Sequence, residues 1–510
     1  MKNKILLILC AVLIFASCED FLKESPKHQW DANMAVSNYD GAKKAVTGIY
    51  GRFMTGDALG TDMAGRLCCK LYLTLCSSFP YEKDLTYTAT NTPTTVWSKA
   101  YQGINSANFA IEQISKLSDN IFPSAKAKNE LLGEAYFLRG YLHSLVMLNY
   151  CYWWTDDDSS PYGVIYRDEV AYPENVNTPR STVGDSWKSI FDDIDFGIEN
   201  MSSTFTTPRR VSQIFAKAWK AKLLMVRGEY EDAQDLIDEA LAALPAAGIA
   251  MQSDMAEHYN QAWDSKENIF VRYLEDNENR TANAGTFTTR GAQYFASTAT
   301  QRTDASGNAY WYPAQTAAQC GLNNPEALQW MRRDPRWTVI TGVTRHPLAN
   351  YRTYQWTFTK LFRKGEYQGM YGSPKDEKYA IYFMRVPELY IMKAECLAHN
   401  GASYADAIAP INQMRAQRTN PVLPQIAAPA TEQAMWDLIF REYVAELILE
   451  NGCEFFASVR IPHSTGKSYL EAYRAARSQN TDFAKLQWPI PSAEIINNLA
   501  LAGMQNPGQD

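Results

Sequence analysis

Apolar residues recur at helical spacing through much of the chain. From Leu131 they follow one another three or four positions apart, which places them on one face of a helix: Ala135, Leu138, Leu142 and Leu145. Similar but weaker patterns run from Gly41 to Phe53 and from Val96 to Leu117, and a further stripe runs from Trp187 to Ile198. These patterns predict a mainly α protein.

Two segments resemble each other, and each has the pattern of a helix, a turn closed by glycine and a second helix. The shared positions are Ala221, Gly228, Tyr230 and Ala233 in the first, and Ala394, Gly401, Tyr404 and Ala407 in the second. Glycine can adopt the left-handed conformation that ends a helix, and alanine lets two helices approach closely. The repeat predicts tetratricopeptide-like helical hairpins, which need stacked neighbours to bury their faces. An unrelated pair of antiparallel helices is the alternative.

Residues 250–380 have a different pattern. Gly, Asn, Thr and Ser are dense, most of all between Thr286 and Gly307, and helical periodicity is poor. We expect long irregular connections here with a few short strands, for example at Ile269–Tyr273. Loops of such length inside a domain commonly carry function.

The N-terminus has the pattern of an export signal. Lys2 and Lys4 precede an apolar run of 12 residues from Ile5 to Ala16, which is too short to span a bilayer. The segment Leu13–Cys18 is similar to a bacterial lipobox. It predicts that residues 1–17 are a signal peptide, that cleavage occurs before Cys18 and that the Cys18 thiol is acylated. The alternative is an ordinary signal peptide followed by an incidental cysteine. Since no other segment has 18 consecutive apolar residues, we expect an anchored chain, not a spanning one.

Composition narrows the functional class. With 510 residues, 46% of them apolar and 21% charged, the sequence is typical of a globular protein, and a net charge of −7 argues against nucleic-acid binding. Aromatic residues are plentiful, at 13 Trp, 30 Tyr and 21 Phe. Cysteines lack the C-x-x-C spacing of a metal site, so most are expected to be small buried residues. A disulfide among Cys68, Cys69 and Cys76 remains open.

The sequence has no recognisable catalytic motif. It lacks G-x-G-x-x-G, G-x-x-x-x-G-K-[ST], G-x-S-x-G and H-E-x-x-H, and its six histidines show no metal-ligand spacing. His143, within a predicted helix, is expected to be structural. Asp156–Asp158 and Asp304–Asn308 could bind calcium, with solvated loops as the alternative. We therefore expect no enzyme activity and no cofactor other than a possible calcium ion.

A series of short motifs runs along the whole chain. In order they are Ser17-Cys18-Glu19-Asp20-Phe21-Leu22, Ala45-Val46-Thr47-Gly48-Ile49-Tyr50, Trp97-x3-Tyr101-x2-Ile104-x2-Ala107-Asn108, Glu134-Ala135-Tyr136-Phe137-Leu138-Arg139-Gly140-Tyr141, Asp334-Pro335-Arg336, Ile490-Pro491-x2-Glu494-Ile495 and Gln505-Asn506-Pro507-Gly508. Together they resemble the SusD/RagB family of outer-membrane lipoproteins of the Bacteroidetes. The chain departs from the family where Glu454 and Ala457 replace an arginine and an aspartate, and where Tyr443 replaces an arginine. These departures suggest that some internal ion pairs are replaced.

The resemblance implies a non-enzymatic, lipid-anchored protein at the surface of the outer membrane. It would form a lid over a SusC-like TonB-dependent transporter, capture oligosaccharides and pass them to the barrel. It also implies one SusD-like domain over residues 18–510. Tetratricopeptide-like hairpins at about 35–245 and 380–460 would then support a loop-rich ligand-binding region at about 250–380.

Three alternatives to glycan capture stay open. The chain could capture another nutrient such as a peptide, or act as a tetratricopeptide-type scaffold that binds proteins through its repeats. A surface glycosidase would need two carboxylates at a set separation, which a sequence cannot show.

The candidate ligand-binding residues are aromatic. Sugar faces need flat apolar rings, with polar groups nearby for the hydroxyls. Tyr310, Trp311 and Tyr312 form the densest aromatic cluster of the loop-rich region, flanked by Asn308 and Gln315. Burial of Trp311 in the core is the alternative. Further candidates are Tyr294, Phe295, Tyr72 and Tyr81, whereas Trp97 is expected to be a packing residue.

Overall fold

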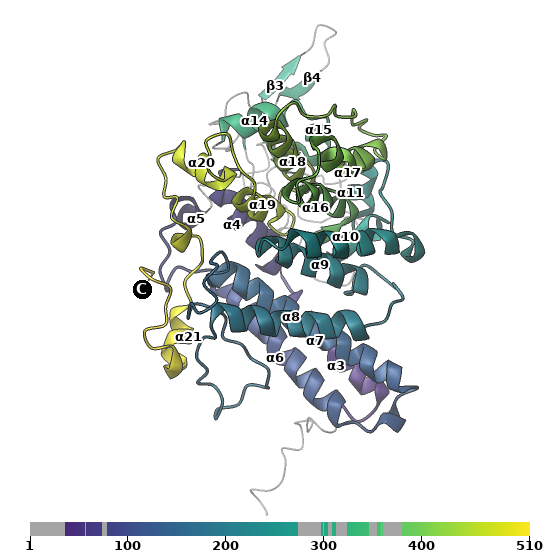
Figure 1. Ribbon diagram of the computed structural model, residues 1–510, viewed down its shortest axis with the longest axis vertical. Coiled ribbons are helices and arrows are strands. Elements are labelled where there is room, and N and C mark those ends of the chain that lie inside the picture. The colour runs from purple at the N-terminus through teal and green to yellow at the C-terminus, as the bar shows by residue number, and fades with distance from the viewer. Residues whose placement is uncertain are drawn as a thin grey trace, which may run out of the picture.

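Long helices packed side by side build the N-terminal half of the protein (Figure 1). The computed structural model describes residues 36–56, 58–73, 79–273, 297–298, 300–303, 309–312, 324–345, 354–358, 360 and 380–509. The long helices lie where the apolar spacing predicts them: α3 (Tyr39–Phe53), α6 (Thr94–Lys116), α7 (Ala125–Tyr150) and α8 (Val183–Asn200). Shorter helical segments connect them: η1 (Ala58–Asp62), α4 (Met63–Lys70), α5 (Pro80–Asp84) and η3 (Asp119–Ile121).

Helix α7 is the centre of this half. Ser124 caps its start by accepting a hydrogen bond from the Ala127 amide, and every residue from Phe137 to Tyr150 is buried. The sequence predicts one apolar face, yet the second half of α7 is covered on all sides, because α3, α6 and α8 pack around it and the C-terminal segment crosses its end. The Trp488 amide donates to the Asn149 carbonyl at this crossing.

The two predicted helical hairpins are confirmed. They are α9 (Gln213–Val226) with α10 (Tyr230–Ala243), and α16 (Val386–His399) with α17 (Tyr404–Ala416). Gly228 and Gly401 close the first helix of each pair with φ angles of +80° and +79°. Helix α10 packs on α16, so the two hairpins stack in the tetratricopeptide manner although they are far apart in sequence.

The C-terminal segment closes the fold. Helix α18 (Glu432–Leu447) packs on α16 and α17, and α19 (Cys453–Arg460) contacts α18, α20 (Tyr469–Ala475) and α4. The last elements are η7 (Phe483–Lys485), α21 (Ser492–Asn497) and η8 (Leu499–Leu501). The closing family motifs serve packing, since the Gln505 side chain binds both backbone polar groups of Ile490 and Asn506 donates to the Tyr150 carbonyl.

Short strands and helices make up the described parts of residues 245–385. Strand β1 (Asn268–Tyr273), predicted at Ile269–Tyr273, pairs antiparallel with β7 (Ala380–Arg385). A second sheet has the order β2–β6–β5, and β3 pairs with β4. The bounds are β2 (Ser297–Thr298), β3 (Thr300–Thr303), β4 (Ala309–Tyr312), β5 (Thr341–Arg345) and β6 (Tyr354–Phe358). The accompanying helices are η4 (Pro245–Ala247), α11 (Met255–Gln261), η5 (Ala262–Asp264), α14 (Pro325–Met331) and α15 (Trp337–Ile340).

Candidate ligand-binding site

The aromatic cluster at residues 310–312 lies on strand β4. This strand pairs antiparallel with β3, so that Trp311 is opposite Gln301 and Tyr310 is opposite Arg302 in the Cα register. The β3–β4 pair lies at one end of the molecule, beyond α14, while α3 lies toward the other end (Figure 1). The structure thus places the three aromatic residues on a peripheral hairpin and not on a helix.

Sequence reasoning did not find the residues on the opposite strand. Gln301 and Arg302 pair with the aromatic strand, and amide and guanidinium groups are the types that bind sugar hydroxyls. The signal for this hairpin was present in the sequence, because Ser306, Gly307 and Asn308 separate two short polar and aromatic runs. Asn308, Gln315, Tyr294 and Phe295 lie outside the described residues, as does Cys18.

The two tyrosines of the early segment differ in accessibility. Tyr81, on α5, is 42% exposed, so its ring can meet a ligand. Tyr72 is only 2% exposed, its hydroxyl donates to the Lys83 carbonyl, and the Arg477 guanidinium lies 4.9 Å from its ring centre. The structure corrects the expectation for Tyr72, because a ring covered in this way cannot stack on a sugar.

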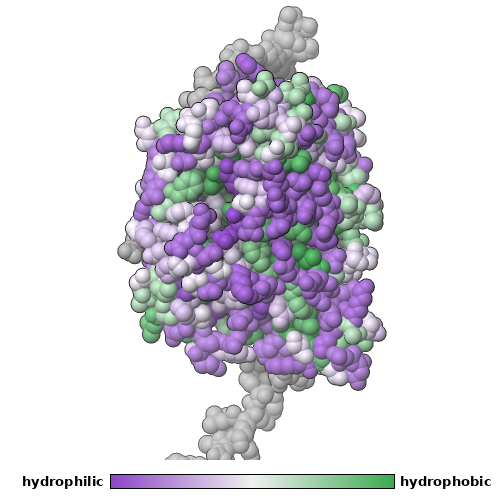
Figure 2. Space-filling model, in the orientation of Figure 1, coloured by the Kyte–Doolittle hydropathy of each residue, from purple (hydrophilic) through white to green (hydrophobic). Residues whose placement is uncertain are grey.

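A cavity of about 540 Å³, here called the scaffold cavity, lies between α8, α9 and α10. The Trp187 and Phe191 rings in its wall stack at 5.7 Å, and Lys220 and Arg227 at its rim pair with Asp195 and Asp158. In Figure 2, apolar residues gather near the position of α8 and α9 among hydrophilic ones. Trp187 is 2% exposed, so it offers no open ring face. Of the two stacked rings, only the half-buried Phe191 offers surface to the scaffold cavity.

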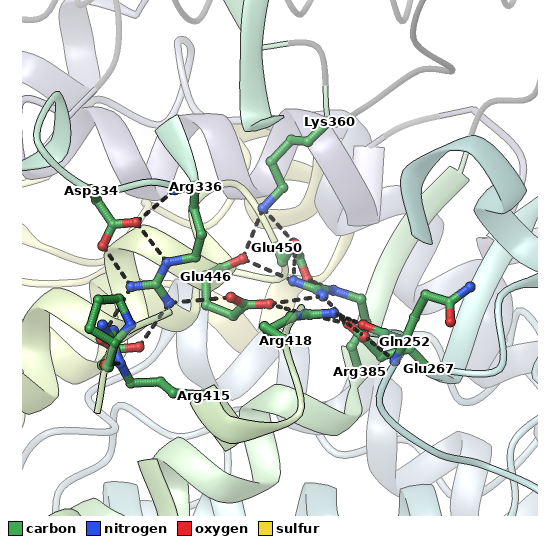
Figure 3. Close-up of polar contacts among 12 residues, drawn as sticks. Gln252, Glu267, Asp334, Arg336, Lys360, Arg385, Arg415, Arg418, Glu446 and Glu450 are labelled. Atoms are coloured by element: carbon green, nitrogen blue, oxygen red, sulfur yellow. Dashed lines mark hydrogen bonds and ion pairs between the residues drawn. The ribbon is translucent and has the colours of Figure 1, made fainter. Parts of the chain in front are cut away.

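A buried network of ion pairs fixes the base of the loop-rich region (Figure 3). Arg385, at the end of β7, donates to Glu267 at 2.5 Å and to Glu450 at 2.7 Å. Arg418, after α17, binds Glu267 at 2.6 Å and Glu446 at 2.5 Å. These side chains come from four segments of the chain and are almost wholly buried. The network therefore joins the β1–β7 pair to α18.

The Asp334-Pro335-Arg336 motif extends this network. Arg336 contacts Asp334 at 2.7 Å and Glu442 at 2.8 Å, and its Nη1 lies 3.3 Å from Glu446. Burial would raise the pKa of Glu446, but the charges of Arg418, Arg385 and Arg336 hold it well below its usual range. The carboxylate is therefore ionised at neutral pH. The motif, between α14 and α15, ties both helices to α18 of the helical scaffold.

Two of the residues that differ from the family motifs, Tyr443 and Glu454, change the contacts in the interior. Tyr443 donates to Glu395 at 2.7 Å, and Arg460 forms a bidentate pair with the same carboxylate at 2.7 and 2.9 Å. Glu454 takes no ion pair with a described cation, since nearby Lys360 is bound to Glu450 at 2.5 Å. Burial raises the pKa of Glu454 to about 7. A buried carboxylic acid thus stands where the family motif has an arginine.

The buried histidines are structural. The His143 ring binds the Arg139 carbonyl through Nδ1 and the Arg167 amide through Nε2, which confirms the expectation for this residue. Burial, with the charge of Arg139, lowers the pKa of His143 to about 3. His258 is likewise buried, and its pKa is also about 3. Both rings are therefore neutral at physiological pH.

The loop at Asp156–Asp158 follows α7, as expected. Asp157 accepts hydrogen bonds from Ser159, and Asp158 pairs with Arg227 at 3.2 Å. In the described part of the chain, no three His, Cys, Asp or Glu side chains gather as a metal site would require. The second calcium candidate, Asp304–Asn308, lies outside the described residues.

Five cysteines of the described chain are buried, in line with the expectation for most cysteines: Cys68, Cys69, Cys151, Cys396 and Cys453. No helix within the described ranges has the length and apolarity to cross a membrane.

Comparison with known proteins gives two family matches. Residues 28–225 match a model described as "Starch-binding associating with outer membrane", and residues 228–508 match the model of the SusD family. A comparison with curated proteins finds no match.

Solved structures of similar fold are numerous. A SusD superfamily protein of Bacteroides thetaiotaomicron is 19% identical, with a TM-score of 0.67 over 92% of this chain and 100% of its own. A laminarin-binding SusD-like protein is 18% identical, with a TM-score of 0.67 over 92% and 99%. Surface glycan-binding protein A of Bacteroides fluxus is 15% identical, with a TM-score of 0.65 over 92% and 99%. At these identities the likeness shows the fold, and with the match over residues 228–508 the chain belongs to the SusD family.

Proposed function

We propose that this protein is a cell-surface, lipid-anchored glycan-binding protein. It captures oligosaccharides and delivers them to a SusC-like TonB-dependent transporter in the outer membrane, and it is not an enzyme. Membership of the SusD family supports the proposal, as do the names of two structural relatives, one laminarin-binding and one glycan-binding.

The observation that carries the proposal is the position of the aromatic cluster. Tyr310, Trp311 and Tyr312 lie on a hairpin strand at the periphery, opposite a strand that contains Gln301 and Arg302. Aromatic residues on one strand, paired in register with a glutamine and an arginine on the other, are the two kinds of residue that a sugar site needs. Asn308 and Gln315, which flank the strand in sequence, would add further amides.

A lipid on Cys18 would anchor the protein to the outer membrane, and more than one acyl chain gives firm anchoring.

A glycan array probed with a soluble form that lacks residues 1–18 tests the function. We expect binding to one class of oligosaccharide, no binding to a peptide array at the same protein concentration, and no release of reducing ends from the bound glycan. Binding to peptides without any glycan would replace the proposal with peptide capture. Cleavage of the bound glycan would show that the protein is an enzyme.

A further inference from the structure

A second cavity, here called the arginine cavity, lies between α3, the segment before α9 and strand β1. Its volume is about 470 Å³, within the range of small-ligand sites. The described residues that line it come from three parts of the sequence: Thr47, Tyr50, Gly51, Met54, Thr55, Thr207, Arg209, Arg210 and Arg272. Sequence reasoning did not find this cavity, because no single segment contains it.

The arginine side chains are held in place by the surrounding structure. Arg210 forms a bidentate pair with Glu134 at 3.0 and 2.9 Å, and its guanidinium lies 5.3 Å from the centre of the Tyr50 ring. Arg272 donates to the Gly56 carbonyl at 2.6 Å. Arg209 meets Asp264 at 3.4 Å. The side chains of Arg209 and Arg210 are 36% and 35% exposed, so both can reach a ligand.

The charge of the lining differs from that of the whole chain. Among the described residues that line the cavity, three are arginines and none carries a carboxylate, although the chain has a net charge of −7. Lys99 adds a cation at the rim, where its ammonium group donates to the Thr55 hydroxyl at 2.6 Å. Glu134 and Asp264 pair with Arg210 and Arg209 from outside the lining, so the charges of Arg272 and Lys99 leave the cavity with a net positive surround. A positive, concave surround raises the local concentration of anions.

The other lining groups favour a particular kind of anion. A planar guanidinium binds carboxylate or sulfate oxygens through two parallel hydrogen bonds. Three threonines supply hydroxyl groups, and Met54 and Tyr50 supply apolar surface. A bare inorganic ion would use the arginines alone, whereas an acidic sugar would use all three kinds of contact.

We propose that the arginine cavity binds the carboxylate of an acidic oligosaccharide. This site is separate from the β4 cluster. The identification of the ligand as a saccharide rests on the proposed function. The binding of an anion by the cavity is independent of that function.

The test compares an acidic oligosaccharide with its uncharged ester and with an inorganic anion. Isothermal titration of the full-length mature protein in detergent would use trigalacturonate, its fully methyl-esterified form and inorganic sulfate. The variant Arg209→Gln removes one partly exposed cation. Lys188→Gln is the matched control, because it removes a 72% exposed cation of α8 that does not line the arginine cavity.

We expect trigalacturonate to bind at least about tenfold more tightly than its ester. Arg209→Gln should weaken the binding of the acid about fivefold or more, and Lys188→Gln should leave it unchanged. Equal affinity for acid and ester, no binding of the acid, or an unaffected Arg209→Gln variant would overturn the proposal. Binding of sulfate that depends on Arg209, without binding of trigalacturonate, would leave an inorganic anion site and overturn its saccharide part.

Failure of the anion-site proposal can be distinguished from failure of the proposed function. Arg209→Gln should not alter the binding of a neutral glycan found on the array, because that ligand contacts the β4 cluster. If neutral glycans fail to bind while the acid binds through Arg209, the β4 proposal fails and the anion site stands.

Discussion

Two buried glutamates show how one side chain can have opposite effects on stability. Glu395 is paired with Arg460 and accepts a hydrogen bond from Tyr443. Glu454 accepts hydrogen bonds from the Leu449 amide at 3.2 Å and from the Cys68 thiol, but forms no ion pair with a cation in the described structure. Ionisation is therefore favourable for Glu395 and costly for Glu454.

The first prediction concerns Glu454→Gln. Burial raises the pKa of Glu454 to about 7, so between pH 5 and 7 the folded state holds a proton that the unfolded state has lost. This stabilising contribution is present at low pH and disappears as the pH rises through that range. We expect Glu454→Gln to stabilise the fold by about 1–3 kcal/mol at pH 8 and to have little effect at pH 5. Urea denaturation at the two pH values measures both.

The matched control for that prediction is Glu395→Gln. Its loss leaves Arg460 buried without a carboxylate, so we expect destabilisation by about 3 kcal/mol at pH 8. If Glu454→Gln destabilises the protein at pH 8 as Glu395→Gln does, Glu454 has an ionic partner and the assignment is wrong.

At the scale of single residues, the sequence predicts that certain side chains are important but not which distant side chains they contact. The family motif predicts that Arg336 matters, but its contacts with Glu442 and Glu446 depend on segments more than 100 residues away. The sequence gives no sign that Tyr72 is buried, because this residue follows a short helix in a segment without clear periodicity. In the structure its backbone has a φ of +61°, and its side chain lies in the interior.

At the scale of elements, the helices follow from apolar spacing and the hairpins from two glycines. The second prediction tests the glycine at the first turn. A Cβ at Gly228 would meet no atom within 4 Å, so the cost of Gly228→Ala comes from its positive φ alone. We expect a loss of about 1 kcal/mol, and more for Gly228→Val. Chemical denaturation measures the change in the free energy of unfolding.

Gly48→Ala is the matched control. Gly48 lies inside α3, is exposed, and has equally open space around a Cβ, but without a positive φ. Alanine there should stabilise the fold by about 0.5–1 kcal/mol. Equal effects at Gly48 and Gly228 would contradict the role of the left-handed turn.

The pairing of β3 with β4 could not be predicted with the same certainty as the helices. Strands of four residues give little periodicity, and pairing depends on contacts between separate segments. The same reason explains why both cavities were missed, since each is lined by residues from several elements.

For the whole molecule, the third prediction concerns the anchor. Cys18→Ala removes the thiol that would be acylated, so we expect the protein to leave the membrane fraction or to accumulate with its signal peptide uncleaved. Membrane fractionation and the mass of the N-terminus measure these outcomes. A Cys18→Ala protein that still sediments with the outer membrane would show that another feature attaches it.

The central claim is that the β4 aromatic cluster binds glycan. The most direct measurement is a titration of the glycan found on the array against wild type, Trp311→Ala and Tyr172→Ala. Tyr172 is a 48% exposed tyrosine of another loop and serves as the control. We predict that Trp311→Ala weakens binding at least about tenfold, about 1.4 kcal/mol, with a nearly unchanged melting temperature, and that Tyr172→Ala binds normally. Unchanged affinity of Trp311→Ala would contradict the claim, and a large loss of melting temperature would show that Trp311 is a core residue.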